Sequence, residues 1–329
     1  PVLLAMQAEF YRKQGHDVYW IPTHYKDEFR DYGVGHYWCK QKWDKVITEP
    51  ENLPFLTLPR PDRIFTYAKS YTSGNYKYLP GTHIMSASGC WWGKCSFCVE
   101  NEEVFQYKVM NTKNSIALTK TPNFHKPYEV RPVEDVIEEI EECKSLGFKE
   151  VFDDSASFPT GEWREKFMGL IAPLAISFSC NMRIDKRIDF KALKKANFRM
   201  LLFGIESASQ YTLDIINKGV EVEDIIPTLK RATECGLENH IAVIFGCIGE
   251  TDEDATRTLR LVWYLLRKGY AKTAQASLYR VTGTIPNETH KKYIKKIYEA
   301  ALFPDFWWVR RNEDIKYLWR GIKSYYAKD

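Results

Sequence analysis

The sequence lacks a long hydrophobic run, a strong excess of charge of either sign and the cysteine density of a disulfide-rich protein. No stretch of about 18 consecutive apolar residues occurs, so we expect no transmembrane helix and no membrane partner. The chain carries 47 basic and 43 acidic side chains, a formal net charge of +4. Such a small excess gives no reason to expect a nucleic-acid partner. Eight cysteines in 329 residues are too few for a disulfide scaffold and indicate a reducing, cytoplasmic environment.

The chain also lacks a secretory signal and an initiating methionine. It begins at Pro1, which suggests a fragment or a processed product. Its 44% hydrophobic and 27% charged content is typical of a globular protein. The length fits one large α/β domain with appendages, or two domains.

Three of the eight cysteines lie within nine residues, in the stretch Gly-Cys-Trp-Trp-Gly-Lys-Cys-Ser-Phe-Cys at residues 89–98. Iron-sulfur clusters are held by cysteine thiolates, usually four, so three would leave one iron open to another ligand. A structural zinc site or three unrelated core cysteines are the alternatives. Zinc prefers four ligands, and His83 and His125, the nearest other candidates, show no recognisable pairing. The other cysteines read as small buried residues: Cys39, Cys143, Cys180, Cys235 and Cys247.

Strands and helices alternate from about residue 83 to about residue 280. For example, Pro132 opens a helix with apolar residues at a 3.6-residue period, and Gly147 ends it. Six such units predict parallel strands with right-handed crossovers, and hence a partial (β/α)6 barrel, because a full (β/α)8 barrel needs about 250 residues. The expected strands are 83–88, 148–152, 175–179, 200–204, 241–245 and 273–278. The expected helices are 132–146, 162–171, 190–196, one that is broken near Lys218-Gly219 and runs to Cys235, and 252–268.

The remaining chain divides into three further regions around this barrel of residues 81–285. Residues 1–48 begin with a helix and an expected strand at 17–21, a short α/β segment. Residues 49–80 have the proline-rich composition of a linker. Residues 286–329 are expected to form a helical extension. Its basic aromatic stretch, 306–311, could contact nucleic acid or a peptide, but we favour a solvated helical face that packs its aromatic residues onto the barrel.

Polar residues follow the expected strands at the edge where ligands bind in parallel α/β folds. Asp153 and Asp154 follow strand two and could accept hydrogen bonds from an ammonium group, or could cap the next helix. Arg183 follows strand three and offers a guanidinium for a carboxylate, or a surface salt bridge. Glu206 follows strand four, where its carboxylate could accept ribose hydroxyls or an amine, and Ser209 could cap the next helix.

The cysteine stretch resembles the cluster loop of the radical S-adenosylmethionine (radical SAM) enzymes, and most of all that of their cobalamin-associated branch. The usual spacing there is C-x3-C-x2-C, whereas this loop has one extra residue between its first two cysteines. Loops with a Trp-Trp-Gly insertion resemble those of a subgroup placed near peptide-modifying enzymes. The strand end Gly-Ile-Glu-Ser at 204–207 is similar to a second family motif, and the glycine turn at 246–249 to a third.

The resemblance implies a four-iron four-sulfur cluster on Cys90, Cys95 and Cys98 and SAM on its open iron. A reductant such as a flavodoxin or ferredoxin would supply the electron that cleaves SAM to a 5'-deoxyadenosyl radical, which abstracts hydrogen from a small-molecule or peptide substrate. The resemblance also implies the following contacts to SAM: Asp153 or Asp154 to the methionyl amine, Arg183 to the carboxylate, Glu206 and Ser207 in the second motif, and Gly246 and Gly249 beside the adenine.

Cobalamin is a further cofactor that the resemblance raises, together with cobalamin-dependent methylation as an alternative reaction. Two features argue against it: the family's cobalamin motif Asp-x-His-x-x-Gly is absent, and only about 50 residues precede the linker, too few for a full domain. From a different class, an iron-sulfur electron carrier or a zinc-stabilised binding module would fit the cysteines alone. Binding of SAM separates an enzyme from both, because neither needs it.

Overall fold

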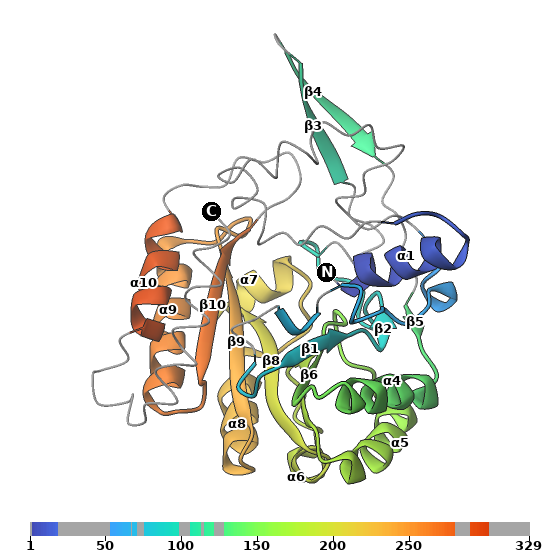
Figure 1. The fold of residues 1–329 in the computed structure, drawn as a ribbon. Coiled ribbons are helices and arrows are strands. Elements are labelled where there is room, and N and C mark those ends of the chain that lie inside the picture. Colours follow the sequence, from blue (N-terminus) through green and yellow to red (C-terminus); the bar gives the residue numbers. More distant parts are fainter. Residues whose placement is uncertain are drawn as a thin grey trace.

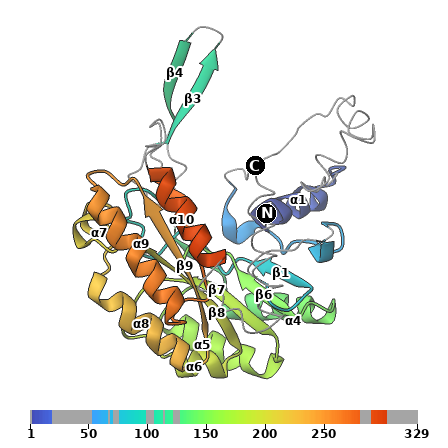
Figure 2. The same ribbon diagram turned by 90° about the vertical axis from the view of Figure 1, so that its left-hand side faces the viewer.

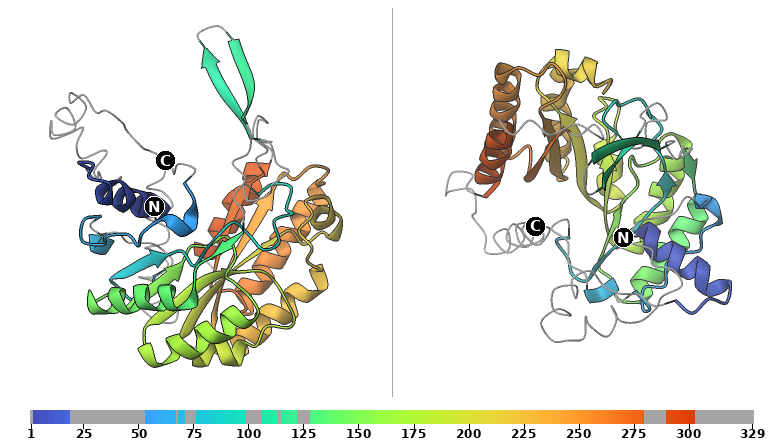
Figure 3. Two further views of the ribbon diagram at one scale, coloured as in Figure 1. Left: turned by 90° about the vertical axis from the view of Figure 1, so that its right-hand side faces the viewer. Right: turned by 90° about the horizontal axis from the view of Figure 1, so that it is seen from above.

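A six-stranded sheet forms the centre of the computed structural model, which describes residues 2–18, 53–66, 68–70, 76–98, 106–112, 115–121, 128–279 and 290–302. The strand order is β1-β6-β7-β8-β9-β10, and every neighbouring pair is parallel. The sheet curls into a half-barrel with helices around it (Figures 1 and 3), which confirms the predicted partial (β/α)6 barrel. The strands are β1 (Gly81–Ile84), β6 (Glu150–Asp153), β7 (Ser177–Met182), β8 (Phe198–Glu206), β9 (Glu238–Phe245) and β10 (Thr273–Leu278).

The helices between these strands begin and end where local sequence signals place them. Pro132 stands at the N-cap of the first, and Gly147, with a φ of 86°, follows its end. The predicted break near Lys218 separates two helices, with Asn217 and Gly219 both at positive φ. These helices are α4 (Val133–Ser145), α5 (Glu162–Ile171), α6 (Phe190–Lys195), α7 (Gln210–Ile215), α8 (Val222–Glu234) and α9 (Asp252–Arg267).

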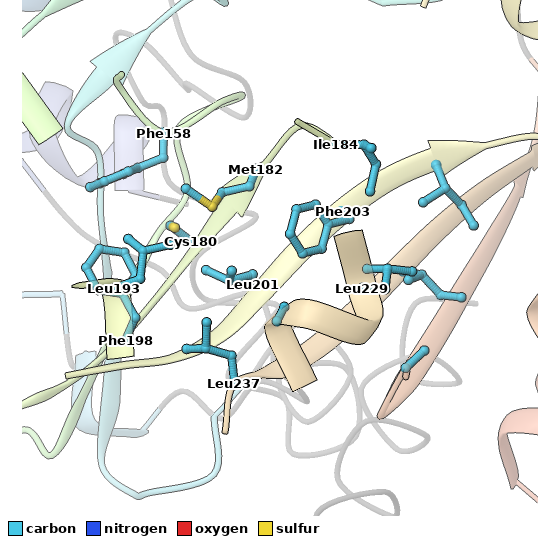
Figure 4. Packing of buried hydrophobic residues seen from close by; sticks show 14 of the residues in the cluster. Phe158, Cys180, Met182, Ile184, Leu193, Phe198, Leu201, Phe203, Leu229 and Leu237 are labelled. Atoms are coloured by element: carbon cyan, nitrogen blue, oxygen red, sulfur yellow. The ribbon is translucent and has the colours of Figure 1, made fainter. Parts of the chain in front are cut away.

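The main hydrophobic core lies between the sheet and these helices (Figure 4). Phe158, Phe167, Phe178 and Phe198 form its aromatic centre, with ring centroids 4.9–6.2 Å apart. Aromatic pairs at such distances add to the free energy gained by burial. Cys143, Cys180 and Cys247 are buried as predicted, Cys235 is half-buried, and Cys39 lies outside the described residues.

A charged network ties together the amino ends of three strands. The Arg199 guanidinium at the start of β8 lies 2.9 Å from a Glu150 oxygen in β6 and 2.7 Å from a Glu238 oxygen in β9. Lys77 donates to the other Glu238 oxygen at 2.8 Å. Arg199 and Glu150 are buried, so the pairing offsets a desolvation cost that either charge alone would carry.

Near the N-terminus, α1 (Val2–Lys13) packs onto the first part of the proline-rich segment. Met6 joins Phe55 and Leu58 in a small buried cluster, and Arg12 forms an ion pair with Asp62 at 2.9 Å. Two short 3-10 helices, Phe55–Thr57 and Ala68–Ser70, lie in this segment. Of the strand expected at 17–21, residues 17 and 18 are not in a strand and the rest lie outside the described residues.

Two pairs of antiparallel strands were not predicted. β3 (Gln106–Thr112) and β4 (Ser115–Thr121) form a hairpin that projects from the half-barrel (Figures 1 and 2). β2 (Ala87–Ser88) pairs with β5 (Glu129–Val130). The prediction of one strand over 83–88 was therefore wrong, because the parallel pairing ends at Ile84 and the chain then turns to pair with β5.

At the other edge of the sheet, α10 (Lys291–Leu302) packs against β10 and α9. The Tyr298 hydroxyl accepts a hydrogen bond from the Ala276 N–H at 3.2 Å and lies 3.0 Å from the Ala276 carbonyl, to which it donates. The helix confirms part of the expected C-terminal extension, whereas the aromatic stretch at 306–311 lies outside the described residues. In the part of the chain that the structure describes, no helix has the length and apolarity to cross a bilayer.

Candidate active site at the cysteine loop

The cysteine loop, residues 89–98, follows β2 and docks on the connector between α7 and α8, residues 216–221. The Ser96 N–H donates to the Ile216 carbonyl, and the Trp92 indole N–H donates to the Asn217 carbonyl, both at 2.9 Å. Gly219 makes room for the Trp92 ring, because a Cβ at this position would lie 2.1 Å from a ring atom. The loop is thereby held at the carboxyl edge of the sheet, where the polar strand ends lie.

Within the loop, Cys95 is buried and Cys90 and Cys98 are half-buried, and none of the three forms a disulfide. In the ranges that the structure describes, no set of three or more His, Cys, Asp and Glu side chains could hold a single metal ion. An iron-sulfur cubane bonds each thiolate to a different iron, so its ligands need not converge on one point. Three thiols in one glycine-containing loop match the donor set of such a cluster.

Arg183, at the end of β7, lies against the loop. One guanidinium nitrogen is 3.9 Å from the Cys95 sulfur, and another donates to the Lys218 carbonyl. The guanidinium also lies 4.6 Å from the Trp92 ring centroid and 5.4 Å from that of Trp91. Burial raises the pKa of the Cys95 thiol, while the cations Lys218 and Arg183 act in the opposite direction. These cations favour the thiolate, the form that binds metal.

Glu206 ends β8 and is paired with a lysine that the sequence analysis did not select. Its carboxylate lies 2.6 Å from the Lys218 ammonium, and both side chains are buried. Glu206 has a φ of 59°, and the pairing register between β8 and β9 shifts at this point. Gly204 leaves space for the pair, because a Cβ there would lie 2.3 Å from the carboxylate. Glu206 also lines a cavity of about 400 Å³ along the inner sides of β9 and β10, with Gln275 and Ser277.

The two aspartates at the end of β6, Asp153 in the strand and Asp154 after it, lie in different environments. Asp153 is fully buried and accepts hydrogen bonds from the backbone N–H and hydroxyl groups of Ser86 and Ser155. Burial raises the pKa of Asp153, and these bonds partly offset the effect. Asp154 is exposed. The alternative in which the pair caps the next helix was wrong, because α5 begins at Glu162 with Gly161 at its N-cap.

The other predicted residues lie in the turns after β8 and β9. The Ser207 hydroxyl is buried, lies 3.2 Å from that of Thr258 and accepts from the Ser209 N–H at 3.1 Å, so it is engaged within the turn. Ser209 caps α7 as predicted. Gly246 and Gly249 have φ values of 83° and 74°, which favour glycine.

Glu250, which the sequence analysis passed over, holds the turn after β9 from inside. Its buried carboxylate accepts from the Gly246 N–H, and burial raises its pKa to about 7. The His290 imidazole lies 3.6 Å away. The only available sequence signal was its place four residues after Gly246 in the glycine turn.

A second cavity, of about 360 Å³, opens beside Trp91 between the loops that follow β6 and β7. The Trp91 indole N–H donates to the Ser157 hydroxyl at 2.9 Å, which fixes the ring at the cavity wall. Arg164 and Arg187 also line this space. Neither arginine lies at a strand end, and neither was predicted from the sequence as a site residue.

Comparison with known proteins supports the same assignment. A family model described as the radical SAM superfamily matches residues 84–262, more than half of the chain. The chain belongs to the radical SAM superfamily. Members of this superfamily are enzymes that use a four-iron four-sulfur cluster and SAM, so the expectations of an enzyme and of these two cofactors are confirmed at the level of the family.

Among curated proteins, this radical SAM chain is 26% identical over 244 residues to a provisionally named methylthiotransferase of Methanocaldococcus jannaschii, covering 70% of the chain and 46% of the relative. It is 29% identical over 153 residues to an uncharacterized methyltransferase of Pyrococcus horikoshii, covering 45% of the chain and 33% of the relative. The chain thus spans less than half the length of either relative.

Among solved structures, the radical SAM methyltransferase TsrM of Kitasatospora setae, with tryptophan substrate and a SAM analogue bound, superimposes with a TM-score of 0.50. The identity is 16%, and the match covers 73% of this chain and 41% of TsrM. At this identity the likeness shows a common fold.

Proposed function

We propose that this chain is the catalytic core of a radical SAM enzyme that cleaves SAM reductively and abstracts hydrogen from its substrate. The observation that carries the proposal is the loop with Cys90, Cys95 and Cys98, which is fastened at the carboxyl edge of a parallel half-barrel. The same edge presents a carboxylate, a guanidinium and two cavities. The family match favours a cluster over a single zinc ion in this loop.

The three cysteines would hold the cluster, and Arg183 and Lys218 would stabilise its negative charge. When bound to these cysteines, a reduced cluster would supply the single electron for cleavage of the C5'–S bond of SAM, which gives methionine and the 5'-deoxyadenosyl radical. The protein's part is to orient the sulfonium, to exclude water and to place the target C–H bond, since the cofactors carry the difficult chemistry. Trp91 and Trp92, whose rings lie beside the Arg183 guanidinium, would limit the access of water to this part of the loop.

For SAM itself, we propose contacts at the polar strand ends. Asp153 or Asp154 would accept hydrogen bonds from the methionyl amine. Asp154 is exposed, whereas Asp153 is buried and accepts hydrogen bonds from Ser86 and Ser155. Arg183 would bind the carboxylate of SAM. Glu206 and Ser207 would contact the ribose, which would lie in the cavity that Glu206 lines. Gly246 and Gly249 would let the backbone approach the adenine.

The substrate, in our proposal, is a small molecule or a peptide, and the cavity beside Trp91 is the candidate place for it. A flavodoxin or ferredoxin would serve as the reductant. The protein would act in the cytoplasm. Of the four regions, residues 81–285 would carry the chemistry, and residues 1–48, 49–80 and 286–329 would be a short α/β segment, a linker and a helical extension.

A second candidate reaction is cobalamin-dependent methylation. The names of the two curated relatives, a methylthiotransferase and a methyltransferase, and the fold shared with the methyltransferase TsrM favour transfer of a one-carbon or sulfur-containing group.

The test is production of 5'-deoxyadenosine by anaerobically reconstituted, dithionite-reduced protein given SAM. The control is the variant with Cys90, Cys95 and Cys98 all replaced by alanine. We expect product that depends on the cysteines. Absence of product from a wild-type sample that carries iron and sulfide would reject radical chemistry in favour of electron transfer. Formation of methylated product only after cobalamin is added would select the second candidate.

A further inference from the structure

Lys218 brings a positive charge into the buried space behind the cysteine loop. Its ammonium lies 2.6 Å from the Glu206 carboxylate and 5.8 Å from the ring centroid of Phe97, the residue between Ser96 and Cys98. About 8% of each of the two paired side chains is exposed. Burying two charges carries a desolvation cost that their attraction often fails to recover, so such a pair is weakly explained by stability alone.

The backbone around Lys218 is fixed from the side of the loop. Its carbonyl accepts a hydrogen bond from Arg183, and the preceding carbonyl, of Asn217, accepts from the Trp92 indole. The Trp92 ring fills the space that a Cβ on Gly219 would occupy. Lys218 therefore belongs to the same connector that anchors the cysteine loop.

Glu206 fixes the other end of the side chain. Glu206 stands at the end of β8 with a positive φ, which is unusual for a residue with a Cβ. Gly204, two residues earlier, has no side chain and so leaves space for the ion pair between Glu206 and Lys218. A carboxylate so placed directs the ammonium group and also reduces its net field at the loop. Glu206 and Lys218 thus place one negative and one positive charge beside the cysteine loop.

We propose that Lys218 is a positioning residue that sets the reduction potential of the cluster held by Cys90, Cys95 and Cys98, with Glu206 as its counterweight. Reduction adds one negative charge to the cluster, and in a medium of low dielectric constant a nearby cation favours that charge and a nearby anion opposes it. The inference rests on the proposed function, because it needs a cluster on these cysteines. Neither residue touches the reacting atoms in this role.

The experiment is a redox titration, followed by the electron paramagnetic resonance signal of the reduced cluster, on anaerobically reconstituted full chain without SAM. The variants are Lys218→Gln, which removes the cation, Glu206→Gln, which removes the anion, and Lys218→Arg, which keeps the cation. We expect the midpoint potential to fall in the first, to rise in the second and to stay near that of the wild type in the third. Iron and sulfide per chain are measured in every sample.

Opposite shifts distinguish charge tuning from a structural role, which would lower cluster content in both glutamine variants without opposite shifts in potential. Unchanged potentials, or shifts in the same direction, at full cluster content overturn the proposal. Should Lys218→Gln fail to hold the cluster, the double variant Glu206→Gln/Lys218→Met leaves no unpaired charge, and its potential must lie below that of Glu206→Gln, or the proposal fails.

The outcome also separates this inference from the proposed function. A wild-type chain that binds no cluster on reconstitution overturns both. A wild-type chain that binds the cluster and forms 5'-deoxyadenosine, while the glutamine variants titrate at the wild-type potential, rejects only the role of Lys218.

Discussion

At the scale of single residues, Glu250 shows how burial couples proton binding to stability. Its folded pKa of about 7 lies above its ordinary value of 4.5. The folded chain therefore holds the proton more tightly than the unfolded chain, and this stabilisation is fully present below the unfolded pKa and lost as the pH rises through about 7. Glu250→Gln stays neutral and can still accept the Gly246 N–H. We expect the variant to gain in unfolding free energy relative to wild type between about pH 5 and pH 8, measured by urea denaturation.

The titratable neighbours of Glu250 are the same in wild type and in Glu250→Gln. The difference in unfolding free energy between the two proteins therefore reports on the Glu250 carboxyl group. Asp254 raises the pKa of Glu250, and His290, Asp252 and Lys292 lie close by on α9 and at the start of α10. Parallel stability curves for the two proteins across this pH range would contradict the assignment of a raised pKa to Glu250.

Residue-scale prediction from sequence worked where the role depends on local chain direction. Ser209 was predicted to cap the helix after strand four because a hydroxyl at an N-cap needs only its own following turn. Arg183 was expected at a strand end, and it lies there, but its partners are the Cys95 sulfur and the Lys218 carbonyl, 88 and 35 residues away in sequence. Such partners come from tertiary packing and leave no local pattern.

At the scale of elements, the connector after α7 controls the place of the cysteine loop. Gly219→Ala would put a methyl group 2.1 Å from the Trp92 ring, so we expect the loop to shift. In cluster-free protein the tryptophan emission should move to longer wavelength as Trp92 becomes more exposed, and iron retention after reconstitution should fall.

Gly236→Ala is the matched control for this prediction. Gly236 has a similar positive φ, 78° against 63° for Gly219, so both substitutions carry the same kind of backbone strain, about 1 kcal/mol. A Cβ at Gly236 would meet only the flexible end of Lys194, 3.5 Å away. Equal emission spectra for the two variants would show that strain, and not the contact with Trp92, matters.

The charged network at the amino ends of β6, β8 and β9 predicts a large effect of one substitution. Arg199→Met leaves Glu150 buried without its cation, and removing one partner of a buried pair costs about 3–5 kcal/mol. We expect a loss of this order in unfolding free energy by denaturant titration. Arg257→Met removes an exposed pair with Glu253 on α9 and should cost about 0.3–0.5 kcal/mol. Similar losses in both variants would refute the role of burial.

At the scale of the whole molecule, the half-barrel was predictable because central strands such as β6, β8 and β9 are largely buried on both faces. Such strands are continuous apolar runs, as in the Met200–Phe203 stretch of β8, whose residues are nearly all buried. The hairpin of β3 and β4 was missed because it projects from the sheet, and its two strands pair only with each other among the described residues.

An open half-barrel also has consequences for how copies of the chain meet one another. An edge strand with unsatisfied N–H and C=O groups is a template for strand addition and aggregation. The Tyr298 hydroxyl occupies both polar groups of Ala276, in the middle of the edge strand β10. We therefore expect this phenol oxygen to hinder self-association along this edge. Tyr298→Phe should unfold at nearly the same denaturant concentration but form larger particles over time by light scattering, and equal particle size in both proteins would show that α10 alone covers the edge.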